Sequence, residues 1–436
     1  MSRQEVLVTC LAFAAVVCGQ ATDGNSNSGT PQVLLLGRFS PGSSGANGVG
    51  SLPQLFTWPA SSATVAFTNT GSVTVVINGS QAALPPADVD ELIEQENPLF
   101  SWSFFQFDLD GTTVGVGNVS DNATVLTWTH SGLSQGPHNL TITKLSEPLY
   151  GAAVLESITI DPSGQFQAPP PSPGMQSGRR MMFVGDSYTV GFGNTGDSSC
   201  PRSNASNQNA LLGYGPTTAR HYNADYQVIA WSGAGVNVYP NTRQGAKYPR
   251  AVEVAYNPLD PEIIYRADAL DPTVNYTTQD FVPQIIVLAG GTNDFHNTTI
   301  SPDNHVINGA YGLQPVAEWV DMYVNYVQQV RSLYPQASII NLVWPLEVQL
   351  VGVLTPNQTT VYLQYMAAAY TGLQMAGIPN TYMLQLTGEE YENTNWCSSH
   401  PNAATDAIVA GQLIQFIDAV LPSFAGSTGP VTTKAG

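Results

Sequence analysis

The sequence predicts two domains: an N-terminal all-β sandwich and a C-terminal α/β/α three-layer domain with a five-stranded parallel sheet. Residues 31–165 contain short β-branched runs separated by turn residues. Residues 181–421 instead alternate continuous apolar runs with helical patterns. Between the two regions, residues 166–180 are rich in proline, which is typical of a semi-rigid, extended linker.

The sandwich is predicted from the composition and spacing of its short runs. The turn residues Asn69 and Gly71 separate the first two of them. The residues from Gly132 to Pro137 are interpreted as a hairpin turn between the last two. The predicted strands are 63–67, 73–77, 124–128 and 139–143.

The parallel sheet is predicted from five apolar runs, at 181–184, 227–231, 285–289, 339–344 and 382–386. Helical patterns lie between and after these runs, at about 205–221, 315–334, 359–376 and 403–420. A parallel sheet covered by helices on both faces binds its ligands beyond the carboxyl ends of the strands. We therefore expect the functional residues in the loops that follow these strands.

The two ends of the chain differ in composition from both domains. Residues 1–21 combine an early basic residue with an apolar run too short to span a bilayer, which predicts a signal peptide. A buried N-terminal helix is the alternative, but the polar stretch 22–30 follows immediately. Residues 422–436 are rich in glycine, serine and threonine and predict a flexible tail without the apolar end of a lipid anchor.

Charge and potential glycosylation sites point to a secreted protein with a neutral substrate. The chain has 13 Lys and Arg against 32 Asp and Glu, a net charge of -19, which disfavours nucleic acid and anionic membrane surfaces as partners. Eight Asn-X-Ser/Thr triplets suggest an extracellular glycoprotein. They begin at Asn78, Asn118, Asn122, Asn139, Asn204, Asn275, Asn297 and Asn357.

The cysteines agree with an oxidising compartment. Cys10 and Cys18 lie in the predicted signal peptide, so Cys200 and Cys397 remain as a single pair. A disulfide between them would lower the entropy of the unfolded chain and so stabilise the folded state by about 5 kcal/mol in the chain-entropy model. Two free buried thiols are the alternative.

Residues able to perform chemistry follow four of the five predicted strands. They lie in the segments 185–187, 232–235, 290–294 and 396–401. Acyl transfer needs a nucleophile, a base and donors for the developing oxyanion. We assign Ser187 as the nucleophile and His400 as the base, with Gly185 allowing the tight turn before the serine. The oxyanion donors are the backbone N–H groups of Ser187 and Gly233 and the side-chain amide of Asn293. Ordinary turns, an asparagine cap and a surface histidine are the alternative interpretation.

The ordered set resembles the SGNH, or GDSL-type, hydrolases. The resemblance rests on Gly185-Asp186-Ser187, Gly233, the segment 291–294 and His400, in the order of that family. Further N-terminal segments look like the sandwich of carbohydrate esterase family 2; they are 36–39, 56–59 and 144–151. This family joins a jelly-roll-like module to an SGNH catalytic domain. Its activity, the removal of acetyl groups from xylan or glucomannan, is what the resemblance implies for this chain.

One position departs from the common SGNH pattern. An aspartate often stands three residues before the histidine, but here Cys397 occupies that place. We therefore predict a Ser–His dyad in which a backbone carbonyl near 397–399 orients the imidazole of His400. Asp406 is the alternative carboxylate. Cys200 follows Ser187 in the sequence and Cys397 precedes His400. A disulfide between the two cysteines would therefore tie the Ser187 side of the site to the His400 loop.

Weaker patterns complete the prediction. The G-x-S-x-G pattern at 132–136 is rejected as a nucleophile elbow because a β-type run follows it instead of a helix. The remaining histidines are scattered, so we predict no metal and no cofactor; they are His130, His138, His221, His296 and His305. Asp186 and Asp294 are expected to hold their turns. Trp396 and Tyr188 are candidate substrate-binding residues, with core packing as the alternative.

Three functions remain compatible with these residues. The first is a secreted polysaccharide O-deacetylase, and the second is an SGNH esterase or lipase for other esters. The third is a non-catalytic carbohydrate-binding protein with the same fold. The presence of Ser187, Gly233, Asn293 and His400 favours an enzyme. Oligomeric state does not follow from the sequence.

Overall fold

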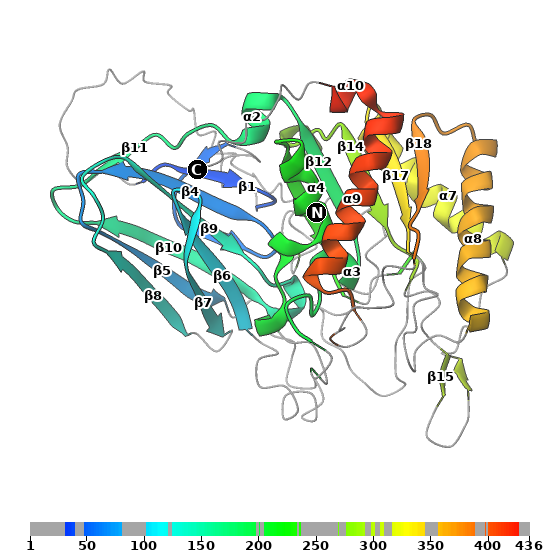
Figure 1. Cartoon of the computed structure of the whole chain (residues 1–436), viewed down its shortest axis with the longest axis horizontal. Helices are drawn as coiled ribbons and strands as arrows, with labels where there is room; N and C mark the ends of the chain where they lie inside the picture. The colour runs from blue at the N-terminus through cyan, green and yellow to red at the C-terminus, as the bar shows by residue number, and fades with distance from the viewer. Residues whose placement is uncertain are drawn as a thin grey trace, which may run out of the picture.

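The computed structural model contains an antiparallel β-sandwich beside an α/β domain (Figure 1). The predicted signal peptide lies outside the described residues. These are 31–39, 48–80, 102–120, 124–197, 200, 205–232, 235–236, 269, 276–292, 298–300, 306–308, 316–344, 356–388, 397 and 400–426.

The sandwich consists of a seven-stranded and a four-stranded antiparallel sheet. In the larger sheet the order is β2-β1-β4-β9-β6-β7, with β11 also paired to β4. These strands are β1 (Val33–Leu36), β2 (Val49–Gly50), β4 (Ser62–Thr68), β6 (Trp102–Leu109), β7 (Thr112–Ser120), β9 (His138–Lys144) and β11 (Gln165–Gln167). In the smaller sheet the order is β3-β10-β5-β8, from β3 (Gln54–Phe56), β5 (Ser72–Ser80), β8 (Val125–Ser131) and β10 (Ala152–Ile160).

Alternate side chains of both sheets fill the space between them, as the period of two in a strand requires. The fully buried ones include Val65, Phe67, Val73, Val75, Ile77, Phe105, Phe107, Leu140 and Ile142. Phe107 of β6 stacks on Trp128 of β8, with ring centroids 4.2 Å apart. Gly115 of β7 makes room for this tryptophan, because a Cβ there would lie 2.7 Å from its indole nitrogen. The apolar pattern of the predicted strands is thus explained by one core.

The predicted hairpin at 132–137 was wrong. The segment joins β8 to β9, but these strands lie in different sheets. β8 pairs with β5, whereas β9 pairs with β4 and β6. A short turn permits either arrangement, and the partner of each strand was decided by pairing with strands distant in sequence.

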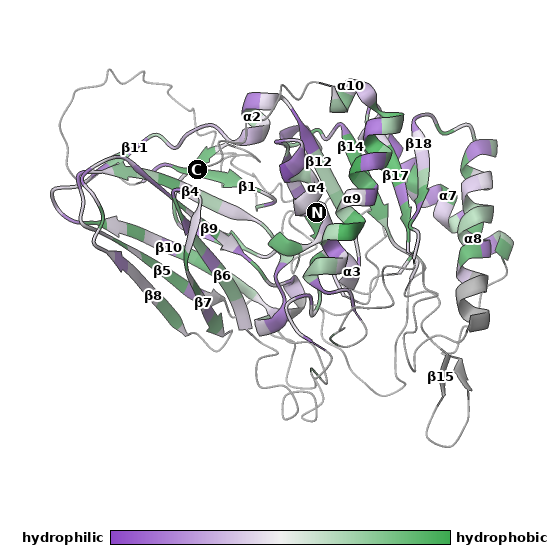
Figure 2. Ribbon diagram, in the orientation of Figure 1, coloured by the Kyte–Doolittle hydropathy of each residue, from purple (hydrophilic) through white to green (hydrophobic). Residues whose placement is uncertain are grey.

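The α/β domain has the predicted five-stranded parallel sheet, in the order β13-β12-β14-β17-β18. Its strands are β12 (Arg180–Gly185), β13 (Asp225–Ala230), β14 (Ile285–Ala289), β17 (Ser338–Val343) and β18 (Thr381–Gln385). Every residue of β14 is at most 1% exposed, and Figure 2 shows β14 and β17 as largely hydrophobic. The strand order changes direction at β12, and a ligand site is expected beyond the carboxyl ends of β12 and β14.

Helices flank this sheet (Figure 1). The longer ones are α4 (Tyr214–His221), α7 (Val316–Leu333), α8 (Pro356–Met375) and α9 (Ala403–Val420). The short ones are α2 (Pro173–Ser177), α3 (Ser187–Val190) and α10 (Pro422–Ala425), with 3-10 turns η2 (Pro148–Tyr150), η3 (Ala205–Asn207), η4 (Ala210–Leu212) and η5 (Thr278–Asp280). A small antiparallel ladder, β15 (Thr298–Ile300) with β16 (Val306–Asn308), was not predicted.

Two helical details differ from the sequence prediction. The expected helix at 205–221 is α-helical only from Tyr214, because Gly213 has an extended backbone that separates α4 from the preceding 3-10 turns. The predicted flexible tail begins too early, since Pro422–Ala425 forms α10. The Phe424 ring there packs edge-on against Tyr222 at 5.2 Å, which holds this turn on the domain.

The proline-rich connection is anchored to both domains. Residues Gln165–Gln167 pair with β4 as β11, and Pro173–Ser177 form α2. Asp225, the first residue of β13, accepts hydrogen bonds from the Ser172 hydroxyl at 2.6 Å and the Gly174 N–H at 2.9 Å. The segment predicted as an extended linker therefore contains secondary structure and is fastened to the parallel sheet.

The two domains also share a buried interface. Trp58, between β3 and β4, is fully buried and belongs to the apolar core of the α/β domain. The Arg38 guanidinium donates to the Gln227 side chain in β13 at 2.9 and 3.2 Å. It also lies 4.1 Å from the centroid of the Tyr276 ring. Arg38 and Trp58 come from the N-terminal segments that carried the family resemblance.

Candidate active site

Ser187 lies at the carboxyl end of β12, as the first residue of α3. Asp186 caps this helix because its Oδ1 accepts the N–H of Tyr188 at 3.0 Å, as predicted for an Asx turn. Gly185 leaves no space for a side chain: a Cβ there would lie 2.6 Å from the Ala289 carbonyl oxygen. The serine is therefore held on a tight turn at the edge where the sheet is expected to bind a ligand.

His400 lies next to this serine although 213 residues separate them in the sequence. Its Nε2 is 2.8 Å from the Ser187 Oγ. The His400 backbone N–H donates to the Cys397 carbonyl at 3.0 Å. Cys397 is joined to Cys200 by a disulfide, which spans 197 residues. The predicted pairing of the two cysteines is therefore present, and it fastens the chain three residues before the histidine.

Aromatic rings surround the imidazole. The His400 ring centroid is 4.6 Å from that of Phe192 and 5.2 Å from that of Tyr188. Tyr188 is 5% exposed, and its ring is 4.6 Å from Trp344. Burial raises the pKa of Tyr188 far above its ordinary value, so its hydroxyl stays protonated. Phe192 was missed at the sequence level, because a single phenylalanine in a loop carries no pattern.

Asp186 also links the serine turn to the segment after β14. Its Oδ2 accepts a short hydrogen bond from the Thr292 hydroxyl. Gly291, just before, has φ +101°, a conformation that favours glycine. The Asp186 carboxyl is fully buried, and this burial raises its pKa to about 7. The segments that follow β12 and β14 are therefore in contact at the carboxyl edge of the sheet.

The Asp406 carboxyl is hydrogen-bonded to groups other than the His400 imidazole. Its Oδ2 accepts a hydrogen bond from the Asn194 amide at 3.2 Å, and its carboxyl also interacts with the backbone of Tyr214 at the start of α4. Asn194 in turn bonds the Asn209 backbone in both directions, at 3.0 Å each. Burial raises the pKa of Asp406 to about 8. These contacts make Asp406 a structural tie between α9 and the segments before α4.

Several predicted site residues lie outside the described part of the chain. They are Gly233, Asn293, Asp294, His296, His305 and Trp396. Their neighbours Ser232 and Thr292 are described, and both lie beyond carboxyl ends of strands adjacent in the sheet to β12. Ser232 bonds to Glu147, a residue of the sandwich side that sequence reasoning did not single out as functional.

The potential glycosylation sites are partly described. Asn78, Asn118 and Asn139 lie on β5, β7 and β9, and the Asn78 amide donates to Glu156 at 2.9 Å. Asn357 lies in α8. The remaining four fall outside the described residues: Asn122, Asn204, Asn275 and Asn297.

A second serine–histidine contact occurs in the sandwich. The Ser134 Oγ is 2.9 Å from the His138 Nε2, and the His138 Nδ1 is 2.6 Å from the Asp110 Oδ2. However, Ser134 is exposed. The Gly136 N–H donates to the Ser134 hydroxyl oxygen at 3.4 Å, so it does not face a space for an oxyanion. A strand follows this G-x-S-x-G segment, as the sequence predicted, where a nucleophile elbow needs a helix. We assign these contacts to holding the inter-sheet connection.

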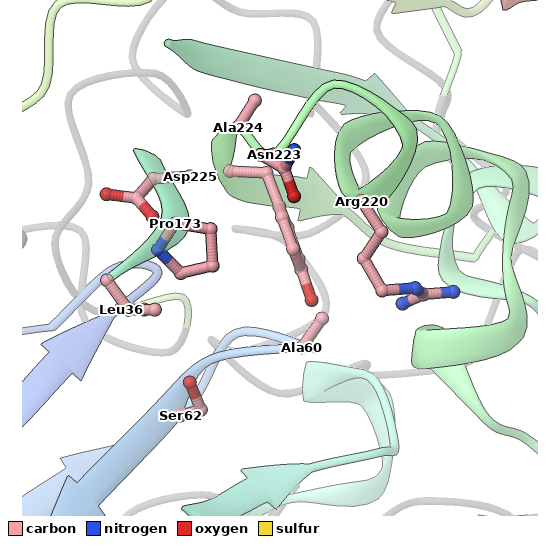
Figure 3. Close-up of a pocket in the computed structure, with 9 residues that line it drawn as sticks. Leu36, Ala60, Ser62, Pro173, Arg220, Asn223, Ala224 and Asp225 are labelled. Carbon is pink, nitrogen blue, oxygen red and sulfur yellow. The ribbon is translucent and has the colours of Figure 1, made fainter. Parts of the chain in front are cut away.

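A cavity of about 330 Å³ lies between the domains (Figure 3), and Ser187 is not among the residues that line it. Leu36 and Ser62 line it from the sandwich, and Arg220 and Asp225 line it from the α/β domain. Asp225 begins β13, so this cavity lies at the opposite edge of the sheet from the serine. In the described part of the chain, no group of three potential metal ligands occurs.

A serine hydroxyl within hydrogen-bond distance of an imidazole, at the carboxyl ends of parallel strands, defines a serine hydrolase. Residues 183–411, more than half of the chain, match the model of the GDSL-like Lipase/Acylhydrolase family, and the chain belongs to this family. It is accordingly a serine esterase.

Its relatives in sequence are carbohydrate-active esterases. The chain is 27% identical over 289 residues to an acetylxylan esterase / glucomannan deacetylase of Cellvibrio japonicus, covering 65% of this chain and 69% of that protein. It is 24% identical over 315 residues to the cellulase/esterase CelE of Acetivibrio thermocellus. This match covers 71% of this chain but only 33% of CelE.

Solved structures of family 2 carbohydrate esterases share the two-domain fold. An enzyme of this family from Clostridium thermocellum, in complex with cellohexaose, superposes with a TM-score of 0.66 at 24% identity, covering 89% of this chain and 99% of that one. One from Corynascus thermopiles (Myceliophthora fergusii) gives 0.63 at 25% identity, also covering 89% and 99%. The fold and the family resemblance predicted from the sequence are therefore confirmed.

Proposed function

We propose that this chain is a secreted carbohydrate esterase that removes O-acetyl groups from polysaccharides of the xylan or glucomannan type. The observation that carries the proposal is the 2.8 Å contact between the His400 Nε2 and the Ser187 Oγ at the carboxyl edge of the sheet. The substrate class is supported by the names of the relatives, which include an acetylxylan esterase / glucomannan deacetylase and an esterase bound to cellohexaose.

The first half of the reaction forms an acetyl-enzyme. The Ser187 Oγ attacks the acetyl carbonyl carbon while the His400 Nε2 takes the hydroxyl proton. The resulting oxyanion accepts hydrogen bonds from the N–H groups of Ser187 and Gly233 and from the Asn293 amide. Each such donor typically contributes about 3–4 kcal/mol to the transition state. The intermediate collapses when His400 returns the proton to the departing sugar oxygen.

The second half regenerates the serine. A water molecule attacks the acetyl carbon, His400 accepts one of its protons, and acetate leaves as the proton returns to the Ser187 Oγ. No metal or cofactor takes part in this scheme. We propose that His400 forms a dyad with Ser187. A backbone carbonyl near 397–399 accepts the hydrogen bond from the imidazole Nδ1–H. This arrangement is supported by the His400 N–H bond to Cys397 and by the separate partners of Asp406.

We propose roles in substrate binding for two aromatic residues, and the exposure of Tyr188 decides its role. Tyr188 is 5% exposed and packs on the imidazole, which favours a wall beside the acetyl group over a surface for a sugar ring. Trp396, adjacent to Cys397, remains the proposed sugar platform. Secretion is proposed from residues 1–21 and from the disulfide between Cys200 and Cys397.

A matched pair of serine variants tests the catalytic assignment. Ser187→Ala should lower kcat on an aryl acetate by at least about 1,000-fold. Ser134→Ala is the control, because Ser134 also has a histidine nitrogen within 2.9 Å but lies in the sandwich. It should leave kcat unchanged. Loss of turnover in Ser134→Ala, or full turnover in Ser187→Ala, contradicts the assignment.

The substrate assignment needs its own measurement. Acetate release should be followed on acetylated xylan and glucomannan and compared with hydrolysis of butyrate and longer acyl esters. Activity confined to longer acyl esters would support a general esterase or lipase. Polysaccharide binding without acetate release, in a protein that also fails on aryl acetates, would support a carbohydrate-binding function instead.

A further inference from the structure

A buried carboxyl group from the sandwich side reaches the segment directly after β13. Glu147 follows β9 by three residues, precedes the turn η2, and is fully buried. Its Oε2 accepts the backbone N–H of Ser232 at 2.7 Å. Its Oε1 accepts the Ser232 hydroxyl at 2.6 Å and the Gln208 amide at 3.2 Å. One side chain from the sandwich side therefore holds Ser232 through two hydrogen bonds and Gln208 through a third.

The orientation of the Gln208 amide is determined by a second bond. Its Oε1 accepts the Glu147 backbone N–H at 2.8 Å, so its Nε2 must face the carboxylate. Each oxygen of Glu147 then faces a group that can only donate: the Ser232 N–H or the Gln208 amide. Lys144 is buried beside this loop and donates from Nζ to the Ser146 and Glu147 carbonyls, at 2.6 and 3.1 Å. The pattern requires an acceptor on both oxygens of residue 147.

The bonded segment lies beside the nucleophile turn. The N–H of Trp231 donates to the Gly185 carbonyl at 3.2 Å, which joins the end of β13 to the end of β12. Ser232 is the next residue, and Gly233 follows it. Glu147 thus holds Ser232, the residue before a proposed oxyanion donor.

We propose that Glu147 is a positioning residue for the esterase reaction, so that the sandwich supplies part of the catalytic unit. The inference rests on the proposed function, in which the Gly233 N–H stabilises the oxyanion. A hydrogen-bond donor stabilises a transition state only when it is already aimed at the place where charge develops. Small displacements of such groups lower turnover even when the substrate still binds. The two bonds between Glu147 and Ser232 constrain the residue before this donor from outside the parallel sheet.

Glu147→Gln tests the requirement for two acceptors, because it preserves size and places an amide against a donor. We expect kcat on an aryl acetate to fall about 10- to 100-fold, with KM within about threefold of the wild-type value. The double variant Glu147→Gln/Gln208→Glu puts an acceptor opposite the new amide. It should recover most of the lost kcat.

A matched control separates positioning from stability. Asp225 is also buried, also accepts a serine hydroxyl and a backbone N–H, and lies at the other end of β13 (Figure 3). Asp225→Asn should lower the urea midpoint comparably to Glu147→Gln while leaving kcat unchanged. All rates are measured where each variant is folded by circular dichroism.

Phenylboronic acid provides a readout that a structural role would not change. Its tetrahedral adduct with a serine places an oxygen where the oxyanion would form. Its inhibition constant should rise in Glu147→Gln by a factor similar to the loss in kcat/KM, and stay at the wild-type value in Asp225→Asn. If Glu147→Gln does not fold, Ser232→Ala carries the same comparison, since it removes only the 2.6 Å bond.

The outcomes distinguish this inference from the proposed function. Wild-type kcat and boronic acid inhibition in Glu147→Gln, or in Ser232→Ala if it replaces that variant, overturn the role of Glu147. Full loss in Glu147→Gln without recovery in the double variant also overturns it. Failure of Ser187→Ala to lose turnover overturns the proposed function itself. If the wild type hydrolyses aryl acetates but not polysaccharides, the aryl acetate measurements still decide the role of Glu147.

Discussion

Asp186→Asn removes the ionisable group from the residue before the proposed nucleophile and changes little else. In the wild type, Oδ1 accepts the Tyr188 N–H and Oδ2 accepts the Thr292 hydroxyl. Asparagine can keep both bonds, because its oxygen accepts from Tyr188 and its amide donates to the Thr292 oxygen, which accepts as well as donates. We therefore expect the variant to fold and to retain the link between the two segments.

The magnitude follows from the buried carboxyl. Burial raises the pKa of Asp186 from 3.8 to about 7. At about 1.4 kcal/mol for each pH unit, this difference corresponds to about 4 kcal/mol. The unfolded chain loses the proton near pH 4, whereas the folded chain keeps it until about pH 7. The stability of the wild type must therefore fall as the pH rises through this window, and this contribution is absent from the asparagine variant.

Urea unfolding at pH 5 and pH 8 measures the effect. The free energy of unfolding of the wild type should fall by about 2.5 kcal/mol relative to Asp186→Asn between these pH values. Asp186→Ala should be less stable than Asp186→Asn by about 2–5 kcal/mol at both, because it leaves two buried donors unpaired. Equal pH dependence in the wild type and Asp186→Asn would refute the argument, since it would mean that the buried carboxyl ionises normally.

Three further predictions concern the frame of the site. Replacing Cys200 and Cys397 together by alanine should lower the free energy of unfolding by up to about 5 kcal/mol in urea titrations, and an unchanged urea midpoint would contradict this. Gly185→Ala should destabilise by about 3 kcal/mol or more, because its Cβ would lie 2.6 Å from the Ala289 carbonyl; a wild-type Tm would show that the turn can relax. Asp406→Asn should gain stability relative to the wild type as the pH rises from about 4 to 8, because burial raises the pKa of Asp406 to about 8. Its turnover should stay within about threefold of the wild-type value, and loss of turnover in folded protein would support a triad instead.

The sequence was most informative where physics acts locally. Continuous apolar runs such as Ile285–Ala289 indicated buried strands, and their alternation with helical patterns predicted a parallel sheet. The carboxyl ends of parallel strands meet at one edge, so the serine after β12 and the threonine after β14 could be placed together from sequence alone. The contact between Asp186 and Thr292 agrees with that expectation.

The sequence was least informative where partners are distant in the chain. The connection at 132–137 has the composition of a hairpin, yet its strands pair in different sheets because each finds its neighbours elsewhere. The same connection brings Ser134, His138 and Asp110 into a triad-like contact that no spacing indicates. Only exposure and the surrounding backbone distinguish that contact from the one at Ser187.

By itself, the amino-acid sequence determined the two-domain architecture, the family and the serine and histidine of the candidate site, because periodicity and motif order are carried by neighbouring residues. The tertiary structure alone decided which groups support them. Glu147 reaches Ser232 from another domain, and Asp406 binds Asn194. Such bonds depend on how two separately patterned regions pack, and packing across a domain boundary leaves no periodic trace in the chain.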